Sequence, residues 1–257
     1  MRILIAAVAL VAVVASQAQA QPVLTACSAA VAASTGADVT PTLGAHAAGD
    51  VMVLVGLVRD NDDTVTVGGG TWTALTGSPW TRSTVERYFV FWKRAASAAE
   101  TNPLFDKSTA TGDTYVWTCN WRGATSADPP FDIGTGGTGT SDPATCTALT
   151  TTVEDTSVAI IIGYGDNNNA SIVATGTDPA NYLELFVPDA TGSDGSVGFA
   201  FATKNVAGST GTGSVDFSTS VTAGDGWGCV MVGVLPETGV LGRRHRIHLL
   251  GVGLSPP

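Results

Sequence analysis

The sequence is poor in charged residues, which occupy only 13% of its 257 positions, and its 12 basic side chains face 22 acidic ones. The formal net charge of -10 argues against nucleic acid as a partner, because a protein that neutralises phosphates needs a basic face. Glu, Lys and Arg are too scarce for a helical protein, whereas Gly, Thr, Ser, Ala and Val are abundant. The composition therefore predicts short β-strands joined by tight turns.

No apolar run is long enough to span a membrane comfortably, which takes about 20 residues. The first 20 residues combine an early Arg2 with an apolar run over 3–15 and end in small and polar residues. This layout predicts a cleavable secretory signal, cut before Gln21, with an uncleaved N-terminal arm as the alternative. A rival signal is the lipoprotein-box pattern LTAC at 24–27, in which Cys27 would become a lipid anchor.

The chain repeats several of its own segments in the same order. The matched pairs are TACSAAVA (25–32) with ATCTALTT (144–151), GDVMVLVGLVRDNDD (49–63) with EDTSVAIIIGYGDNNN (154–169), RYFVFWKRAA (87–96) with GFAFATKNVA (198–207), and WTCNWRG (117–123) with WGCVMVGVLP (227–236). The repeat predicts two duplicated half-units, about 25–134 and 143–236. Each half-unit would begin with a strand carrying cysteine and close with a Trp-x-Cys strand.

Residues 21–238 are predicted to form an all-β domain. The join between the halves, DIGTGGTGTSDPAT, has the length of a loop within a domain, and apolar runs such as 158–162 are typical of strands buried on both faces. We therefore expect an antiparallel two-sheet β-sandwich of jelly-roll type, in which each half supplies strands to both sheets. Two tandem small β-sandwiches are the alternative.

Five motifs together carry a family resemblance: HAAGDVMVLVGLV, GGGTWTALTG, YFVFWKRAA, WTCNWRG and WGCVMVGVLPE. Over about residues 25–237 the chain resembles a loose group of β-sandwich proteins that occur in phage virions, in their tail appendages and among secreted bacterial surface proteins. The shared motifs are structural, so the resemblance implies a surface or virion role and transfers no catalytic residue. The cysteines of this chain are not part of the resemblance.

The four cysteines are predicted to form two disulfides, because an even number in an exported chain is typical of disulfide pairing. The repeat favours Cys27–Cys119 with Cys146–Cys229. Cys27–Cys229 with Cys119–Cys146 respects the duplication equally well. Buried free thiols, in a virion assembled in the cytosol, are a third interpretation. A zinc site is not expected, since no CxxC pair is present and the histidines are scattered.

Two loops at equivalent places in the halves are rich in Asp and Asn. RDNDD contains Asp60, Asp62 and Asp63, and GDNNN contains Asp166 and Asn168. Carboxylate and amide oxygens gathered on a turn are suitable calcium ligands, so these residues are the candidates for a calcium site. Asp and Asn are also the ordinary residues of hairpin turns, and the turn interpretation needs no ion. No other cofactor is predicted.

No catalytic set is recognisable, and we predict that the protein is not an enzyme. There is no GxSxG motif, and His46 is the only histidine within the predicted sandwich. Among the glutamates Glu184 is the best candidate acid, although a solvent-facing strand position explains it more simply. Trp72, Trp80 and Trp121 are candidates for stacking on sugar rings, with core packing as the alternative.

The C-terminal segment 239–257 is predicted to be a basic arm. Its Arg243, Arg244 and Arg246 contrast with the acidic body, which suggests docking on an acidic neighbour. LPETG at 235–239 matches a sortase motif, but the basic residues come next and no apolar span follows them. We therefore expect this motif to be the end of the last strand and a turn.

The predicted function is a non-enzymatic structural or adhesion protein, extracellular or on a virion surface, that assembles with itself or with other surface or virion proteins. Its features are the signal-like start, the duplicated sandwich and the missing catalytic set. A secreted carbohydrate-binding module is the alternative, and a glycan hydrolase is a more distant one.

Overall fold

The computed structural model describes residues 21–28, 31–33, 38–59, 64–83, 86–108, 113–141, 143–164, 172–176, 178–180, 182–187, 196–211, 213–217 and 226–237. All helical or strand structure in these ranges is β-strand, and all strand pairs are antiparallel. The all-β prediction is confirmed. Over the same ranges no helix has the length and apolar character needed to cross a membrane.

The first half of the chain forms a seven-stranded sheet with the order β1-β9-β3-β7-β5, in which β2 also pairs with β9 and β6 with β7. The strands are β1 (Val23–Cys27), β2 (Val31–Ala33), β3 (Val51–Val58), β5 (Thr73–Ala74), β6 (Trp80–Ser83), β7 (Glu86–Arg94) and β9 (Thr114–Arg122). Two further strands, β4 (Val65–Gly68) and β8 (Leu104–Lys107), pair with each other.

The second half, which in the structure begins at residue 131 rather than at 143, forms a six-stranded sheet with the order β10-β20-β14-β17-β16, and β11 also pairs with β20. Its strands are β10 (Phe131–Ile133), β11 (Gly137–Gly139), β14 (Thr156–Tyr164), β16 (Leu183–Val187), β17 (Ser196–Lys204) and β20 (Trp227–Val234). Smaller sheets contain β12 (Ala144–Cys146), β19 (Gly213–Phe217) and β15 (Ile172–Thr175), and β13 (Thr150–Thr151) with β18 (Gly208–Ser209).

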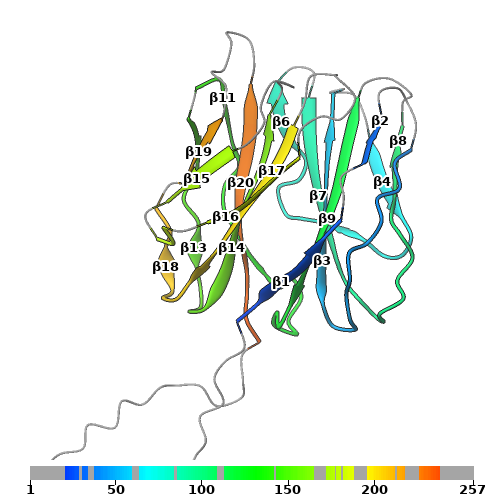
Figure 1. The fold of residues 1–257 in the computed structure, drawn as a ribbon, viewed down its shortest axis with the longest axis horizontal. Helices are drawn as coiled ribbons and strands as arrows, with labels where there is room; N and C mark the ends of the chain where they lie inside the picture. Colours follow the sequence, from blue (N-terminus) through cyan, green and yellow to red (C-terminus); the bar gives the residue numbers. More distant parts are fainter. Residues whose placement is uncertain are drawn as a thin grey trace, which may run out of the picture.

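Each half builds its own large sheet, so the prediction that each half supplies strands to both sheets is wrong. The apolar run of β3 is buried at every position, and so is that of β20, as expected of strands covered on both faces. That burial is achieved by stacking layers, with the two halves side by side in Figure 1. An apolar run shows that a strand is covered, but not which half of the chain covers it.

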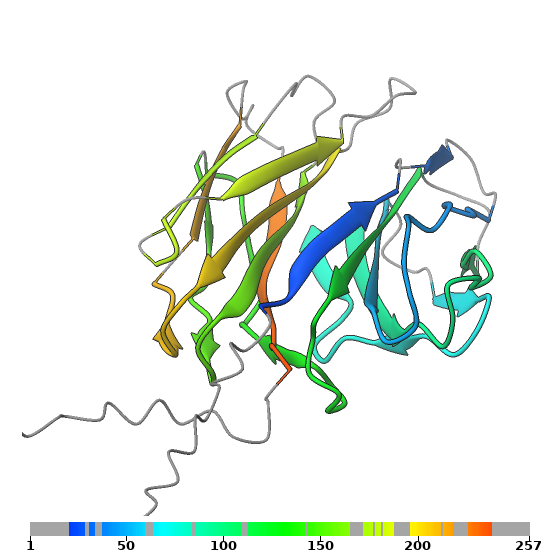
Figure 2. The same ribbon diagram turned by 60° about the horizontal axis from the view of Figure 1, so that its bottom comes forward.

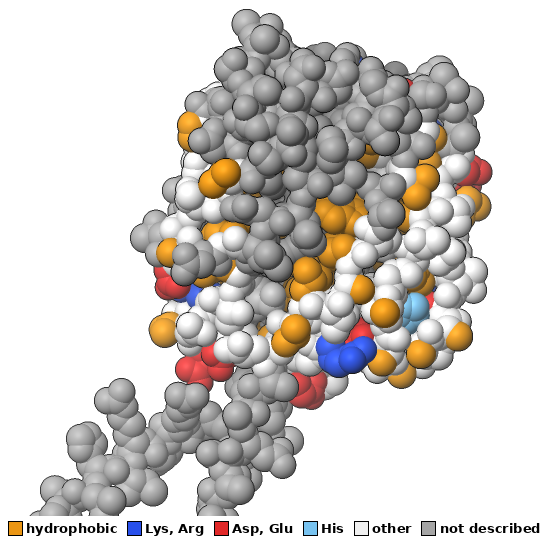
Figure 3. Space-filling view, in the orientation of Figure 1, with side chains coloured by type: hydrophobic (Ala, Val, Ile, Leu, Met, Phe, Trp, Pro, Cys, Tyr) orange, Lys and Arg blue, Asp and Glu red, His pale blue; other side chains and the backbone are white. Residues whose placement is uncertain are grey.

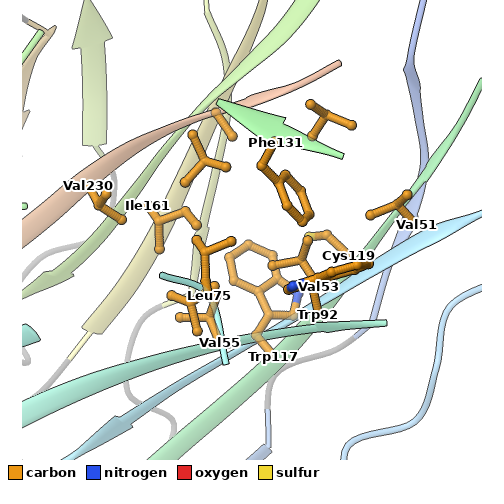
Figure 4. Close-up of a cluster of buried hydrophobic side chains, with 14 of the residues drawn as sticks. Val51, Val53, Val55, Leu75, Trp92, Trp117, Cys119, Phe131, Ile161 and Val230 are labelled. Atoms are coloured by element: carbon orange, nitrogen blue, oxygen red, sulfur yellow. The ribbon is translucent and has the colours of Figure 1, made fainter. Parts of the chain in front are cut away.

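The two large sheets face each other across the largest core cluster. Val53, Val55 and Trp117 of the first sheet meet Ile161 and Val230 of the second in one group of buried side chains. Figure 4 shows these side chains pointing toward one another from strands of both halves. The body is therefore consistent with a β-sandwich whose two central sheets come from different halves.

A smaller layer covers the outer face of each large sheet. On the first sheet, Leu54 and Phe89 pack with Val65 of β4 and Phe105 of β8. On the second sheet, a separate cluster joins β14 and β20 to β12 and β15; it contains Ala144, Cys146, Val158, Ile160, Ala174 and Cys229. The described residues thus form four layers, with the large sheets inside. Turned by 60°, the same layers are seen with β1 crossing the middle of the molecule (Figure 2).

The two large sheets have the same strand path. In each, the first strand of the half (β1 or β10) pairs with the last long strand (β9 or β20), which pairs with the central apolar strand (β3 or β14). The central strand then pairs with a strand that carries a lysine at or next to its end (β7 or β17). In the first half, β4 follows the central strand β3 and β8 precedes β9, and these two strands pair in the outer layer. In the second half, β15 follows β14 and β19 precedes β20, and they too pair in the outer layer. The order of the long strands is therefore the same in the two large sheets.

Candidate functional sites

The Asp- and Asn-rich loops predicted to bind calcium follow the central strands, after Val58 in β3 and after Tyr164 in β14. Their candidate ligands lie outside the described residues; these are Asp60, Asp62, Asp63, Asp166 and Asn168. Elsewhere in the described ranges, no group of three or more His, Cys, Asp or Glu side chains is placed to hold a metal ion. Calcium binding by the loops stays a prediction.

Trp121 does not belong to a sugar-stacking surface. It is 1% exposed and lies in the core cluster between the large sheets. Its Nε1 donates a hydrogen bond to Ser157 Oγ of β14 at 3.3 Å, so the indole links the two halves. A ring enclosed on both faces cannot stack on a ligand, and the prediction for Trp121 is wrong.

Trp80 is partly buried and joins the halves in a similar way. Its ring stacks on Tyr88, with centroids 5.4 Å apart and an interplanar angle of 20°. Its pyrrole edge also meets the segment before β11, where a Cβ added at Gly136 would lie 2.1 Å from Trp80 Cδ1. One ring face is therefore already covered by the protein.

Trp72 packs on the other side of the first sheet, against the outer cluster. The Nζ atom of Lys93 lies 5.6 Å from the centroid of its ring, a cation–π contact. Its Nε1 is buried and has no hydrogen-bond partner among the described residues. Since Trp80 packs against the inner core and Trp72 against the outer one, the two do not form a common platform.

Lys93 forms a buried ion pair with Glu100. Their side chains are 8% and 11% exposed, and Lys93 Nζ lies 2.5 Å from Glu100 Oε2. Glu100 Oε1 accepts hydrogen bonds from the backbone N–H groups of Ala96 (2.6 Å) and Ser97 (3.1 Å). The bond from Lys93 and these backbone bonds lower the pKa of Glu100, although burial raises it. A carboxylate kept ionised and saturated in this way shapes a loop and is poorly suited to proton transfer.

Lys204 is the counterpart of Lys93 in the second half. It stands at the end of β17, as Lys93 stands near the end of β7, and it is 2% exposed. Its ammonium group is paired with the carboxylate of Asp178, a residue that is itself 54% exposed. Each half thus holds a buried lysine through a carboxylate of a following or preceding loop.

Asp50 and Arg122 form a bidentate pair at the start of β3 and the end of β9. Arg122 Nε donates to Asp50 Oδ1 at 3.0 Å and Arg122 Nη2 to Oδ2 at 2.8 Å. The backbone N–H of Ala47 also donates to Oδ2, at 2.8 Å. Burial raises the pKa of Asp50, but the bonds from Arg122 and Ala47 outweigh it, and the net pKa is lowered. This carboxylate is another anchor for a loop.

The remaining candidates for acid–base chemistry are hydrogen-bonded, buried or outside the described residues. His46 Nδ1 lies 2.8 Å from the carbonyl oxygen of Gly44, and its Nε2 accepts a hydrogen bond from the Glu100 backbone at 3.4 Å. Burial raises the pKa of the Tyr88 phenol, which therefore stays neutral. Glu184 lies in β16 opposite Ala200, and its carboxyl group is outside the described part of the structure.

Two disulfides join the cysteines, Cys27 to Cys119 and Cys146 to Cys229. This is the first of the pairings that the sequence leaves open. With its Sγ bonded to Cys119, Cys27 cannot carry a thioether-linked lipid, so this structure contradicts the lipid-anchor alternative. Disulfides of this kind suggest an oxidising, extracellular environment.

The basic arm, with Arg243, Arg244 and Arg246, lies outside the described residues. The first part of LPETG is described, and it is held by the body. Pro236 is buried and forms a bridge with Ala124, and the backbone N–H of Glu237 donates to the carbonyl oxygen of Gly123 at 2.9 Å. These residues continue the last strand, as expected for a chance match to the sortase motif.

Comparison of the chain with protein-family models, with curated proteins and with solved structures finds no match. Function must therefore be argued from the geometry. Of the predicted aromatic residues, Trp80 and Trp121 join the two halves, and the buried carboxylates of Asp50 and Glu100 hold loops.

Proposed function

We propose that the protein is a non-enzymatic structural or adhesion protein, displayed outside a cell or on a virion, that assembles with itself or with another surface protein. The carrying observation is that each half of an all-β body is closed by its own disulfide, over 92 and 83 residues. Disulfides persist where the surroundings are oxidising, and they stabilise the folded body against unfolding.

The use of charged side chains inside the body supports the non-enzymatic part of the proposal. Lys93 and Lys204 are both buried, and each is neutralised by one carboxylate. Asp50 is 3% exposed and is satisfied by an arginine and a backbone N–H. A catalytic acid or base needs a free position for a substrate proton, and these groups have their positions filled by the protein.

We further infer that the two halves are copies of one unit, as the sequence repeat predicts. The shared strand path supports this, and so does the buried lysine at the end of β7 and of β17. Each copy consists of a large sheet and a small outer sheet, and the copies pack through their large sheets. This arrangement is closer to two fused small sandwiches than to a jelly roll.

The alternative of a carbohydrate-binding module has lost much of its support. Its aromatic platform required Trp72, Trp80 and Trp121 on one accessible surface, and they pack in two different layers. The calcium loops would have to bind glycans without that platform.

Mass spectrometry of the secreted fraction and of purified particles tests the proposal. We expect the protein in one of these fractions, beginning at Gln21 and with both disulfides formed. A protein found only in the cytosol, with Met1 intact and its thiols free, would refute it. A glycan array, with and without calcium, tests the alternative, and Trp72→Ala is the variant that should abolish any binding through that ring.

A further inference from the structure

The strand β1 forms one edge of the seven-stranded sheet, and its end is fastened to β9 by hydrogen bonds between Ser28 and both Trp117 and Thr118. Among the described strands it pairs with β9 alone, and its register shifts between Leu24 and Ala26. Val23 is 59% exposed, and Leu24 and Cys27 are only partly buried against the core. Figure 3 shows apolar side chains at the surface near the middle of the face that β1 crosses in Figure 1. Edge strands of this kind are the usual sites of pairing between chains.

A covalent bond fastens this strand. Cys27 and Cys119 are direct register partners in β1 and β9, and they form the first disulfide. Cys27 is partly buried, whereas Cys119 is fully buried. The other disulfide differs, because both Cys146 and Cys229 are fully buried, and it joins an outer strand to a central one. The bond that holds β1 is thus the one that reaches toward solvent.

In the second half, the equivalent edge of the sheet is formed by strands from the middle of the chain. There β10 and β11 pair with β20, and they lie between β9 and β12 in sequence, so strands of the fold precede and follow them. In the first half, β1 is followed by β2 after three residues, 28–30, but no described strand precedes it. The edge strand of the first half is therefore joined to the rest of the described fold at its C-terminal end, where β2 pairs with the same strand β9.

We propose that β1 is an exchangeable strand through which two copies of this chain are joined. Before the disulfide closes, β1 of one copy pairs with β9 of a second copy, and Cys27 of the first then bonds to Cys119 of the second. The edge of β9 presents the same backbone groups and the same position for Leu24 beside Trp121 to either donor. Once the disulfide has closed within one chain, exchange stops.

The bond-forming step is an ordinary thiol oxidation. The Cys27 and Cys119 thiols together lose two protons and two electrons, and a disulfide oxidant such as oxidised glutathione takes them up and becomes two thiols. No other bond changes. The inference rests on the proposed assembly function, and it specifies the contact between copies.

Refolding of a mixture of two isotopic forms tests the exchange. Full-length chains of light and heavy nitrogen are reduced, unfolded, mixed and refolded in a glutathione redox buffer over a range of protein concentrations. The unreduced protein is then digested, and the disulfide-linked peptides are weighed. We expect Cys27–Cys119 peptides of mixed isotope, increasing with concentration toward the value for random pairing. The Cys146–Cys229 peptides are the internal control and should stay unmixed.

Two outcomes would overturn the inference. Cys27–Cys119 peptides that are unmixed at every concentration would show that β1 stays with its own chain. Equal mixing of both disulfides would show unspecific scrambling of thiols.

A second experiment avoids unfolding. The variants Cys27→Ser and Cys119→Ser, each first shown to keep the circular dichroism spectrum of the wild type, are mixed under the same redox buffer. A covalent heterodimer linked through Cys27 and Cys119 is expected, and its absence would count against exchange. If wild-type protein is found on particles but neither experiment links the copies, the proposed function stands and strand exchange fails.

Discussion

The two halves approach each other closely where Tyr88 meets β20. A Cβ added at Gly228 would lie 2.3 Å from Tyr88 Cε1, far inside contact distance. Gly163 pairs directly with Gly228 on the neighbouring strand β14, and there an added Cβ would lie 3.4 Å from Leu57 Cδ1, an ordinary contact. Gly228→Ala should therefore destabilise the protein, and Gly163→Ala is its matched control.

The size of the effect follows from how firmly Tyr88 is held. It is 1% exposed and stacks on Trp80, so it cannot move without displacing a second ring. Overpacking of this kind costs about 1–3 kcal/mol. For a chain of this size each kcal/mol lowers Tm by about 2–4 °C, so a cost of about 2 kcal/mol predicts a fall of about 4–8 °C. Gly163→Ala reduces the entropy of the unfolded chain and should leave Tm unchanged or raise it slightly.

Guanidinium unfolding under oxidising conditions, followed by both tryptophan fluorescence and circular dichroism, gives the free energies. Replacing Tyr88 by Leu removes the obstructing ring, so Gly228→Ala should cost less in that background than in the wild type. If Gly228→Ala proved neutral, or if Gly163→Ala were equally destabilising, the close contact between Tyr88 and Gly228 would be refuted. Coincident transitions of the two probes would further indicate that the halves unfold together.

Three other changes concern the Lys93–Glu100 ion pair, the buried disulfide and the basic arm. The pKa of Glu100 is lowered in the folded protein, so its carboxylate stabilises the fold at pH values above its ordinary pKa of 4.5. The difference in unfolding free energy between the wild type and Glu100→Gln should therefore shrink as the pH falls through the folded-state pKa. Loss of the buried disulfide in a Cys146→Ala, Cys229→Ala double variant should cost about 4–5 kcal/mol in the chain-entropy model, measured by guanidinium unfolding, and a cost near zero would contradict that model. Removing residues 239–257 should leave Tm unchanged but weaken assembly in sedimentation experiments; a misfolded truncated protein would show instead that the arm belongs to the core.

The strands and turns could be predicted from composition and periodicity, but the assignment of strands to sheets could not. The apolar run of β3 requires cover on both faces, and either half of the chain can provide it. In the structure its odd-numbered residues, such as Val53, face the second large sheet, and Leu54 faces β8. Long-range packing decides between these arrangements, and it leaves no local signal in the sequence.

The aromatic residues were misjudged where a local signal was present. Along β9 the alternate residues Tyr115, Trp117, Cys119 and Trp121 all face the same core. A strict period of two over this strand places Trp121 on the face of Trp117 and the cysteine. Trp72 and Trp80 offer no such register, because each stands at or near the start of a very short strand.

The two Trp-x-Cys segments lie in equivalent strands, but their side chains face different layers. Both lie in the last long strand of their half, yet Trp117 and Cys119 face the core between the large sheets, and Trp227 and Cys229 face the outer layer. A shift of one residue along a strand turns every side chain to the other face, so aligning the halves on Trp-x-Cys pairs residues with opposite environments. The two disulfides are consequently different kinds of bond: Cys119 reaches an edge strand of its own sheet, and Cys229 reaches β12 in the layer outside. This difference leaves only the first disulfide at an edge where a second copy can compete for the strand.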